Sequence, residues 1–229
     1  MPNHVRNMLV IDTIDEAEGK KIEAFVKGVS QDNGQPLPFS LQQIRPLPAE
    51  LEPRLNEDGT QMSGLCVSEE DHRRRTTLYG ASDWYEWRRN NWGTKWEAYD
   101  QQHEEGSLVY EFNTAWTSPI EVIKYLSKKF PTSVFGVEYA DEDLGNNCGS
   151  YSIKDGLVIG SHNGDLEYAC NIWGYSYEEE LEARQEDCDA NEDKGVTGPA
   201  MCPECASKAT WSNSSGELQC DECGYSETE

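Results

Sequence analysis

The residues with the clearest chemistry are four cysteines in the C-terminal stretch. They form two C-x-x-C pairs, Cys202/Cys205 and Cys220/Cys223, with fourteen residues between the pairs. Zn²⁺ in structural sites prefers four soft donors arranged as a tetrahedron, and two such pairs supply that set. The spacing therefore predicts one structural zinc ion bound by these four thiolates. Four protein ligands leave no open position for catalysis.

The residues around these cysteines suit a small zinc ribbon over residues 199–229. The stretch 209–219 reads as a minimal hairpin, and so few apolar residues flank it that the metal must supply the folding energy. A redox C-x-x-C is the alternative, but it needs a thioredoxin-like context and one motif rather than two. Spacing does not pair the other cysteines and their role stays open; they are Cys66, Cys148, Cys170 and Cys188.

A second cluster combines aromatic and basic residues in the stretch WYEWRRNNWGTKW, residues 84–96. Interleaved rings and cations are what a single-strand stacking platform requires. Core packing is the interpretation we favour, with a helix that ends near Gly93, Trp84 and Trp87 on one face, and Trp92 and Trp96 turned away. The candidate contacts for a partner or a nucleic acid are Trp84, Trp87, Arg88, Arg89, Trp92, Lys95, Trp96 and, in the predicted ribbon, Trp211.

The elements that position these residues begin with a predicted strand at 3–12. A helix capped by Thr13 or Asp15 follows, with Ile22, Phe25, Val26 and Val29 on its apolar face. We expect a second strand at 39–45. Residues 46–106 then read as a polar helical insertion that carries the tryptophans.

Regular patterning returns with a predicted strand at 107–113, which places Leu108, Tyr110 and Phe112 on one face. Ser118, Pro119 and Glu121 form a capping-box pattern for the next helix, whose apolar stripe is Ile120, Ile123 and Leu126. Three further strands are expected at 134–139, 148–154 and 157–162, the last two joined by an Asp-Gly turn.

This order predicts an α+β fold of the ferredoxin-like type, an antiparallel sheet with two helices on one face and an extra β-hairpin. We expect the ferredoxin-like domain over 1–177. A helix end that passes into a flexible acidic linker is expected over 178–198, followed by the zinc ribbon over 199–229.

Charge limits the classes of partner. The chain has 43 acidic and 19 basic residues, a net charge of −24, and residues 178–229 alone hold fifteen acids and three bases. Phosphate backbones repel such a chain, whereas basic protein surfaces attract it. Acidity that serves only solubility is the alternative. No signal-peptide or membrane-spanning pattern is present, and the free thiols suit a reducing compartment, so we expect a cytoplasmic protein.

Enzymatic motifs are absent from the sequence. His4, His72, His103 and His162 stand apart, and no nucleotide-binding or hydrolase signature occurs. We therefore expect a protein that is not an enzyme, with a hidden active site as the remaining alternative. The acidic stretch 141–143 beside two asparagines could hold a cation, but a solvated loop is the simpler interpretation. Arg73-Arg74-Arg75 is expected to be a solvated face or an internal charge partner.

Five segments in this order resemble a known family: MPNHVRN, IRPLPAEL, DWYEWRRNNWGTKW, FNTAWTSP and GVEYADEDLGNNCGSY. Over about residues 1–175 the chain resembles the YubB-like (Api-type) ferredoxin-like family, carried by bacteriophages and conjugative plasmids. The resemblance implies a ferredoxin-like domain with a helical insertion in a mobile-element protein. It carries over no catalytic residues and says nothing about the predicted ribbon.

Two functions follow as expectations. The first is an accessory protein that binds a basic, nucleic-acid-handling surface of a host bacterial protein, in the manner of an anti-defence inhibitor that competes with nucleic acid. The second is a single-stranded nucleic-acid-binding protein that uses the open face of the sheet, the tryptophan stretch and the zinc ribbon. The net negative charge favours the first.

Overall fold

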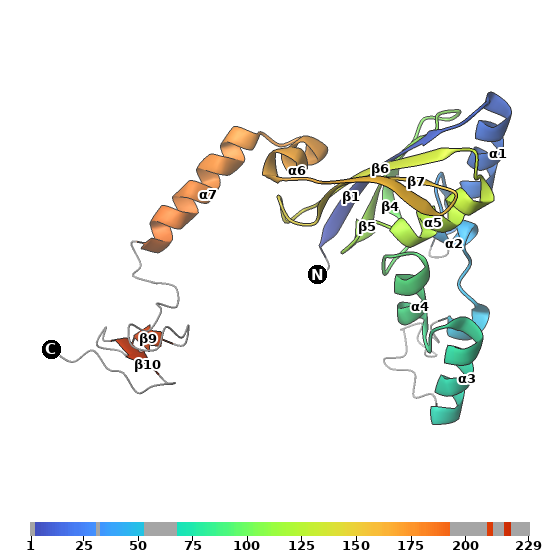
Figure 1. Ribbon diagram of the computed structural model, residues 1–229, viewed down its shortest axis with the longest axis horizontal. Helices are drawn as coiled ribbons and strands as arrows, with labels where there is room; N and C mark the ends of the chain where they lie inside the picture. Colours follow the sequence, from blue (N-terminus) through green and yellow to red (C-terminus); the bar gives the residue numbers. More distant parts are fainter. Residues whose placement is uncertain (1–2, 31–32, 53–67, 193–209, 213–217, 221–229) are drawn as a thin grey trace. The chain divides into compact units, whose positions relative to one another are not determined.

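The computed structural model describes residues 3–30, 33–52, 68–192, 210–212 and 218–220 (Figure 1). The chain divides into two compact units, Met1–Tyr177 and Glu178–Glu229, and each is described by itself. Among the described residues, no helix is both long and apolar enough to cross a membrane.

The first unit contains a six-stranded antiparallel sheet in the order β4-β5-β1-β6-β7-β8. These strands are β1 (His4–Asp12), β4 (Tyr99–Gln102), β5 (Val109–Ala115), β6 (Val134–Asp141), β7 (Cys148–Lys154) and β8 (Leu157–Asn163). Helix α1 (Glu16–Val26) follows β1, and helix α5 (Ile120–Lys129) connects β5 to β6. The order β4-β5-β1-β6 with these two helices is the split βαβ arrangement of ferredoxin-like folds, so the predicted α+β ferredoxin-like fold is confirmed.

The prediction of a second core strand at 39–45 is wrong. Residues Leu41–Ile44 form the short helix α2, and β4 takes the second-strand position in the sheet. The Ser40 side chain caps α2 by accepting from the Gln43 N–H at 3.1 Å. The distant Glu97 carboxylate accepts from the Leu41 N–H at 2.6 Å. A strand pattern was therefore overridden by caps that satisfy the first amides of a helix.

The insertion consequently lies between α1 and β4 instead of following a second strand. It contains the paired strands β2 (Gly28–Val29) and β3 (Pro36–Leu37), then α2, then a 3₁₀ turn (Ala49–Leu51). Helices α3 (Glu69–Tyr79) and α4 (Trp84–Asn91) follow, as Figure 1 shows.

The main core lies between the sheet and helices α1 and α5. Alternate residues of β1 are buried, and Ile22 and Val26 of α1 pack with them. Tyr110 and Phe112 are buried on one face of β5, as predicted, and Phe39 stacks on Phe112 with ring centroids 4.9 Å apart. Val29, expected on the face of α1, lies beyond the end of that helix and is exposed.

The capping box predicted for α5 does not form. Pro119 occupies the N-cap position without a side-chain cap, and Ser118 Oγ instead lies 2.8 Å from the buried Tyr151 hydroxyl. Glu121 forms an ion pair with Lys124 at 2.8 Å. The apolar stripe is present nonetheless, since Ile123 and Leu126 are fully buried. A tertiary hydrogen bond has replaced the local one.

The predicted hairpin of β7 and β8 is confirmed. Asp155 and Gly156 both have positive φ, 47° and 75°, the geometry that two-residue Asp-Gly turns require. Helix α6 (Leu166–Trp173) follows and packs a second small core with Ala140, Leu144 and Cys148.

In the second unit, helix α7 (Tyr177–Glu192) extends well into the range for which we expected a flexible linker. Three glutamates in its first turn favour the helix N-terminus. Strands β9 (Thr210–Ser212) and β10 (Leu218–Cys220) pair antiparallel within the stretch expected to be a hairpin. The Cys202, Cys205 and Cys223 ligands and the side chain of Cys220 lie outside the described part, so the zinc ribbon stays a prediction.

Candidate functional site

The tryptophan stretch divides into a buried part and a surface part. Asp83 caps α4 by accepting from the Glu86 N–H at 2.8 Å. Trp87 and Trp92 are both buried and meet edge to face, with centroids 6.2 Å apart. The expectation that Trp92 turns away is wrong, because α4 ends at Asn91 and the Trp92 indole donates to the Arg45 carbonyl at 2.8 Å. These two rings pack the insertion.

The arginines of α4 lie against aromatic rings. The Arg88 guanidinium is 5.2 Å from the Trp84 ring centroid and 4.7 Å from that of Trp92. Arg89 is exposed and lies 5.6 Å from the Tyr85 ring. Planar guanidinium groups stack well on such faces. Arg88 thus joins two tryptophans of the packed part, whereas Arg89 belongs to the surface part.

At the surface, Lys95 lies among three aromatic rings. Its ammonium nitrogen is 4.7 Å from the Trp116 centroid, 5.0 Å from Trp96 and 5.8 Å from Tyr85. Trp116 is 39% exposed, and the other three side chains are half-buried. We call Tyr85, Lys95, Trp96 and Trp116 the lysine–aromatic cluster. No carboxylate of the described residues forms an ion pair with Lys95.

Two loops build this cluster, and hydrogen bonds join them. The Thr94 hydroxyl donates to the Ala115 carbonyl at 2.8 Å, and the Thr117 hydroxyl donates to the Gly93 carbonyl. Gly93 has φ 88°, and a Cβ there would lie 3.2 Å from the Ile120 nitrogen. Only glycine fits this close approach without strain. The motifs WGTKW and AWTSP, distant in the sequence, therefore form one surface.

The backbone of Trp116 is held in a left-handed conformation, with φ 69°. Its N–H donates to the Asn3 carbonyl at 2.9 Å, and its carbonyl accepts from Asn147 Nδ2 at 2.9 Å. Positive φ is costly for a bulky residue and persists only where the surroundings enforce it. Such strain concentrates at functional sites, which marks the Trp116 loop as a candidate.

Asp141 organises the network behind this loop. Its carboxylate accepts from Asn3 Nδ2 and Asn147 Nδ2, both at 3.0 Å, and from the Asp143 N–H at 2.9 Å. Three donors satisfy this buried group, as polar burial requires. The amide donors occupy the Asp141 carboxylate, which disfavours a cation ligand there; this carboxylate is buried, whereas Glu142 and Asp143 are exposed as in a solvated loop. No group of three potential metal ligands occurs among the described residues.

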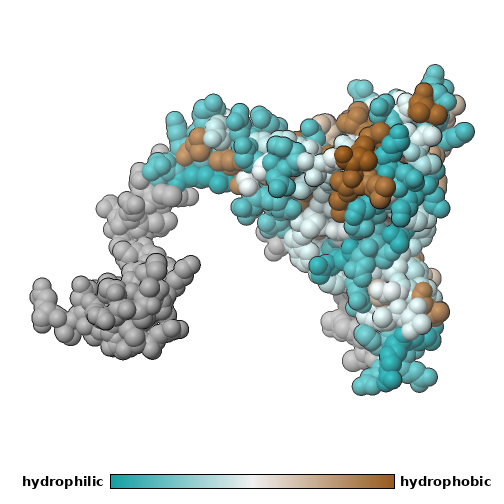
Figure 2. All heavy atoms as spheres, in the orientation of Figure 1, coloured by the Kyte–Doolittle hydropathy of each residue, from teal (hydrophilic) through white to brown (hydrophobic). Residues whose placement is uncertain are grey.

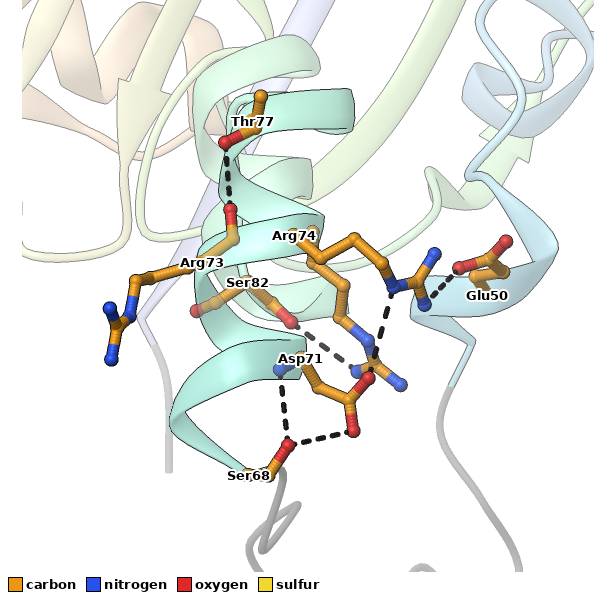
Figure 3. Close-up of polar contacts among 8 residues, drawn as sticks. Glu50, Ser68, Asp71, Arg73, Arg74, Thr77 and Ser82 are labelled. Atoms are coloured by element: carbon orange, nitrogen blue, oxygen red, sulfur yellow. Dashed lines mark hydrogen bonds and ion pairs between the residues drawn. The ribbon is translucent and has the colours of Figure 1, made fainter.

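The three consecutive arginines of α3, residues 73–75, form ion pairs and hydrogen bonds with neighbouring groups (Figure 3). Arg73 pairs with Glu69 at 3.0 Å, and Arg74 pairs with Glu50 at 2.7 Å. Arg75 is buried and donates to the Ser82 carbonyl at 3.4 Å. Figure 3 shows Arg74 between Glu50 and Asp71, from separate elements. Of the two expectations, the solvated face fits Arg73 and Arg74, which are exposed and paired with carboxylates, and the internal position fits Arg75.

The cysteines and histidines of the described part contact different parts of the fold. Cys148 and Cys170 are buried in the second core, and burial raises the pKa of the Cys148 thiol, which disfavours a thiolate nucleophile. His4 Nδ1 lies 2.6 Å from the Tyr99 hydroxyl, and the His103 ring stacks on Tyr110 at 4.3 Å. Cys66 lies outside the described residues, as do the side chains of Cys188 and Trp211.

Strands β5, β1 and β6 place no Phe, Tyr or Trp on the open face of the sheet, although the Trp173 ring of α6 lies 5.9 Å from the Arg6 guanidinium and Tyr99 of β4 meets His4 edge to face. Alternation from the buried positions places Arg6, Met8 and Val10 of β1 on this face, with Glu111 of β5 and Glu138 of β6. Base-stacking sheets carry aromatic residues at such positions. The use of the open sheet face for single strands therefore stays a prediction.

Comparison with known proteins adds a family for part of the chain. Residues 95–189 match the ferredoxin-like domain of Api92-like proteins. The Api92-like match begins at Lys95 and includes Trp96 and Trp116, whereas Tyr85 lies before it. No curated protein and no solved structure matches the chain. The match supports the Api-type resemblance over this range.

Sequence reasoning missed two members of the cluster. Tyr85 lies within the tryptophan stretch, and Trp116 lies in FNTAWTSP, yet neither was a candidate contact. The available signal is that both segments contain Trp and Thr and belong to the same resemblance. Of the predicted contacts, the structure brings Lys95 and Trp96 to this surface and places Arg89 beside it.

Proposed function

We propose that this protein is a non-enzymatic accessory protein that binds a basic surface of a host protein. The observation that carries the proposal is the excess of acidic over basic residues, together with the ion pairs that the basic residues form. In the described part of the chain, seven basic residues form ion pairs with carboxylates: Arg6, Lys20, Lys27, Arg73, Arg74, Lys124 and Arg184. Each pair takes up one acid with one base, so the net charge of −24 is unchanged and an excess of acids is what a partner meets.

The distribution of charge supports a protein partner more than a nucleic acid. Hydrophilic residues cover much of the visible face of the first unit (Figure 2), and the chain as a whole carries −24. Phosphate binding needs cations that displace counterions. Complementary charge raises association rates and discriminates against wrong partners. An acidic accessory protein is therefore suited to a surface that otherwise holds nucleic acid.

The lysine–aromatic cluster supplies a candidate anchor within this acidic surface. Interface hot spots are enriched in Trp, Tyr and Arg, and Tyr85, Arg89 and Trp116 are of these types. An exposed tryptophan on a loop already fixed by hydrogen bonds loses little conformational entropy on binding. Charge would bring the partner close, and the cluster would hold it.

The proposal includes a structural zinc ion bound by Cys202, Cys205, Cys220 and Cys223. The antiparallel pairing of β9 with β10 puts Cys220 at a strand end, opposite Thr210, as a knuckle beside a hairpin requires. The donor set of four thiolates suits Zn²⁺. The ion would supply folding energy to the C-terminal module, which could then serve as a second docking surface.

The biological setting that we propose is a mobile element in a bacterial host. The Api-type resemblance and the match over 95–189 support it. In that setting the basic host surface belongs to a defence protein such as a nuclease, and the accessory protein acts as an inhibitor by competing with nucleic acid.

One observation keeps a second function in view. Arg89 and Lys95 beside Tyr85 and Trp116 would also suit a single-stranded nucleic acid, with bases on the rings and phosphates at the cations. The net charge argues against it.

Affinity purification from host cells with identification by mass spectrometry tests the proposal. A basic host protein should be captured by the full chain and released by raised salt, because screening weakens exposed charge pairs. A Cys202→Ser variant shows whether the predicted ribbon is needed. A matched pair of charge variants locates the surface: Glu178 and Glu179 changed to Gln in one, and Glu104 and Glu105 changed to Gln in the other. Saturable binding of a single-stranded oligonucleotide with no captured protein would favour the second function.

A further inference from the structure

We infer that Tyr85, Trp96 and Trp116 form a cage for a cationic side chain, lysine or arginine, of a partner protein, and that Lys95 occupies this cage in the unbound chain. The inference deepens the proposed function, and rests on it only in assigning the cation to a partner. The chemistry of the cage stands on the geometry alone.

The geometry is that of a cation-binding site because a cation is already in it. The Lys95 ammonium lies within 6 Å of all three ring centroids. Ammonium and guanidinium groups are attracted by ring faces at such distances, and aromatic cages recognise methylated lysine in this way. A lysine side chain from a partner would find the same faces.

The arrangement of the rings disfavours a nucleobase. Tyr85 and Trp116 meet edge to face, with an interplanar angle of 86° and centroids 6.5 Å apart. A flat base between them could stack on one ring only. An ammonium has no plane of its own and can contact the faces of both rings at once. The net charge of −24 on the whole chain also disfavours a phosphate-linked ligand.

The cage is built before any ligand arrives. The Trp116 N–H donates to the Asn3 carbonyl and Asn147 donates to the Trp116 carbonyl, which fixes the Trp116 loop, and hydrogen bonds of Thr94 and Thr117 join that loop to the one that carries Lys95 and Trp96. The 39% exposure of Trp116 leaves a ring face accessible from solvent. Lys95, by contrast, has a flexible four-carbon stem and can leave. Exchange of one cation for another preserves the contacts with the rings.

The test uses the full chain and tetramethylammonium chloride as the probe, with sodium chloride at equal ionic strength as the reference. The indole N–H signals of Trp96 and Trp116 are followed by NMR. A Lys95→Met variant should bind the probe about tenfold more tightly than the unaltered chain, because the internal competitor is gone. Adding Trp116→Ala to Lys95→Met should abolish saturable binding. Lys129→Met, which removes a similar cation from the Tyr125 ring, should bind as the unaltered chain does.

Two results would overturn the inference. One is a natively folded Lys95→Met chain that shows no saturable shift with tetramethylammonium. The other is tighter binding of adenosine monophosphate than of tetramethylammonium, which would make the cluster a base-stacking site. If Lys95→Met is not native by its amide spectrum, Lys95→Gln replaces it. The probe requires no host partner, so a failed capture from cells leaves this result intact, and a failed titration leaves the capture result intact.

Discussion

Gly93 is the residue whose identity matters most for the lysine–aromatic cluster. It combines φ 88° with a close approach to the start of α5, and its carbonyl accepts from Thr117. A side chain here would move the loop that carries Lys95 and Trp96 away from Trp116. The cluster therefore depends on a residue that contributes no side chain to it.

Gly93→Ala should lower the free energy of unfolding by about 1–3 kcal/mol, because alanine is strained at positive φ and its Cβ would press on the Ile120 amide. Gly160→Ala in β8 is the matched control, since nothing lies within 4 Å of the added Cβ and its φ is not in the left-handed region. Urea denaturation of both variants measures the difference. Equal stabilities would contradict the role given to Gly93.

Trp116→Ala addresses function at the same scale. The ring is partly exposed and its loop is held by backbone bonds, so the variant should keep the native fold and unfold within about 1 kcal/mol of the unaltered chain. Its affinity for a captured partner should fall at least tenfold, as expected of an interface anchor. Isothermal titration against that partner measures the loss. Unchanged affinity would remove Trp116 from the interface.

At the scale of elements, the Glu97 carboxylate fixes helix α2 in the insertion. It accepts from the Leu41, Gln42 and Ala98 amides and the Ser40 hydroxyl. Burial raises the pKa of Glu97, although these donors act in the opposite direction. The Glu97 side chain, which lies just before β4, thus stabilises a helix at residues 41–44, where the apolar pattern resembled that of a strand.

The pH dependence of Glu97→Gln tests this arrangement. A raised pKa means that the folded state binds the proton more readily than the unfolded chain, whose value is near 4.5. The stabilisation from Glu97 is then fully present below that pH and is lost as pH rises through the folded pKa. The free energy of unfolding of the unaltered chain should exceed that of Glu97→Gln by about 1–3 kcal/mol at pH 4 and by less at pH 7. A difference that grows with pH, measured by denaturation at each pH, would show that the four donors dominate.

The elements also show what the sequence could predict. Local signals sufficed for β1, α1, β6 and the β7–β8 hairpin, because Asp15, Asp155 and Gly156 satisfy their turns and caps within a few residues. They failed where a partner distant in the sequence decided the outcome. Glu97 accepts from the first amide of the helix at 41–44. The Ser118 hydroxyl hydrogen-bonds to Tyr151 instead of capping the next helix.

The candidate site was predictable in composition but not in membership. The tryptophan stretch signalled interleaved rings and cations, yet the split between packed rings and surface rings depends on where α4 ends. Trp116 belongs to the lysine–aromatic cluster because it follows the end of β5, where the next residue, Thr117, donates to the Gly93 carbonyl. Periodicity carries no information about two loops that meet.

At the scale of the whole molecule, the chain consists of two compact units, and the predicted zinc ion belongs to the second. Purified protein should contain one zinc per chain by atomic emission, and Cys202→Ser should contain less. Because structural zinc supplies folding energy, removal by a chelator should unfold residues 199–229 while the amide signals of residues 1–177 persist. Loss of the signals of both units would contradict their independence.

The net charge of −24 also belongs to the whole molecule. It opposes contact with nucleic acid and favours basic protein surfaces. Inhibition by such a protein would need no active site, since occupying the partner's nucleic-acid surface is enough.

The salt dependence of binding to the captured host protein, with a single-stranded oligonucleotide as competitor, tests the proposed competition for a basic surface. We expect the dissociation constant to rise as salt increases and the oligonucleotide to displace this protein from its partner. Binding that is insensitive to salt and to the oligonucleotide, or direct binding of the oligonucleotide by this protein alone, would contradict the proposed competition.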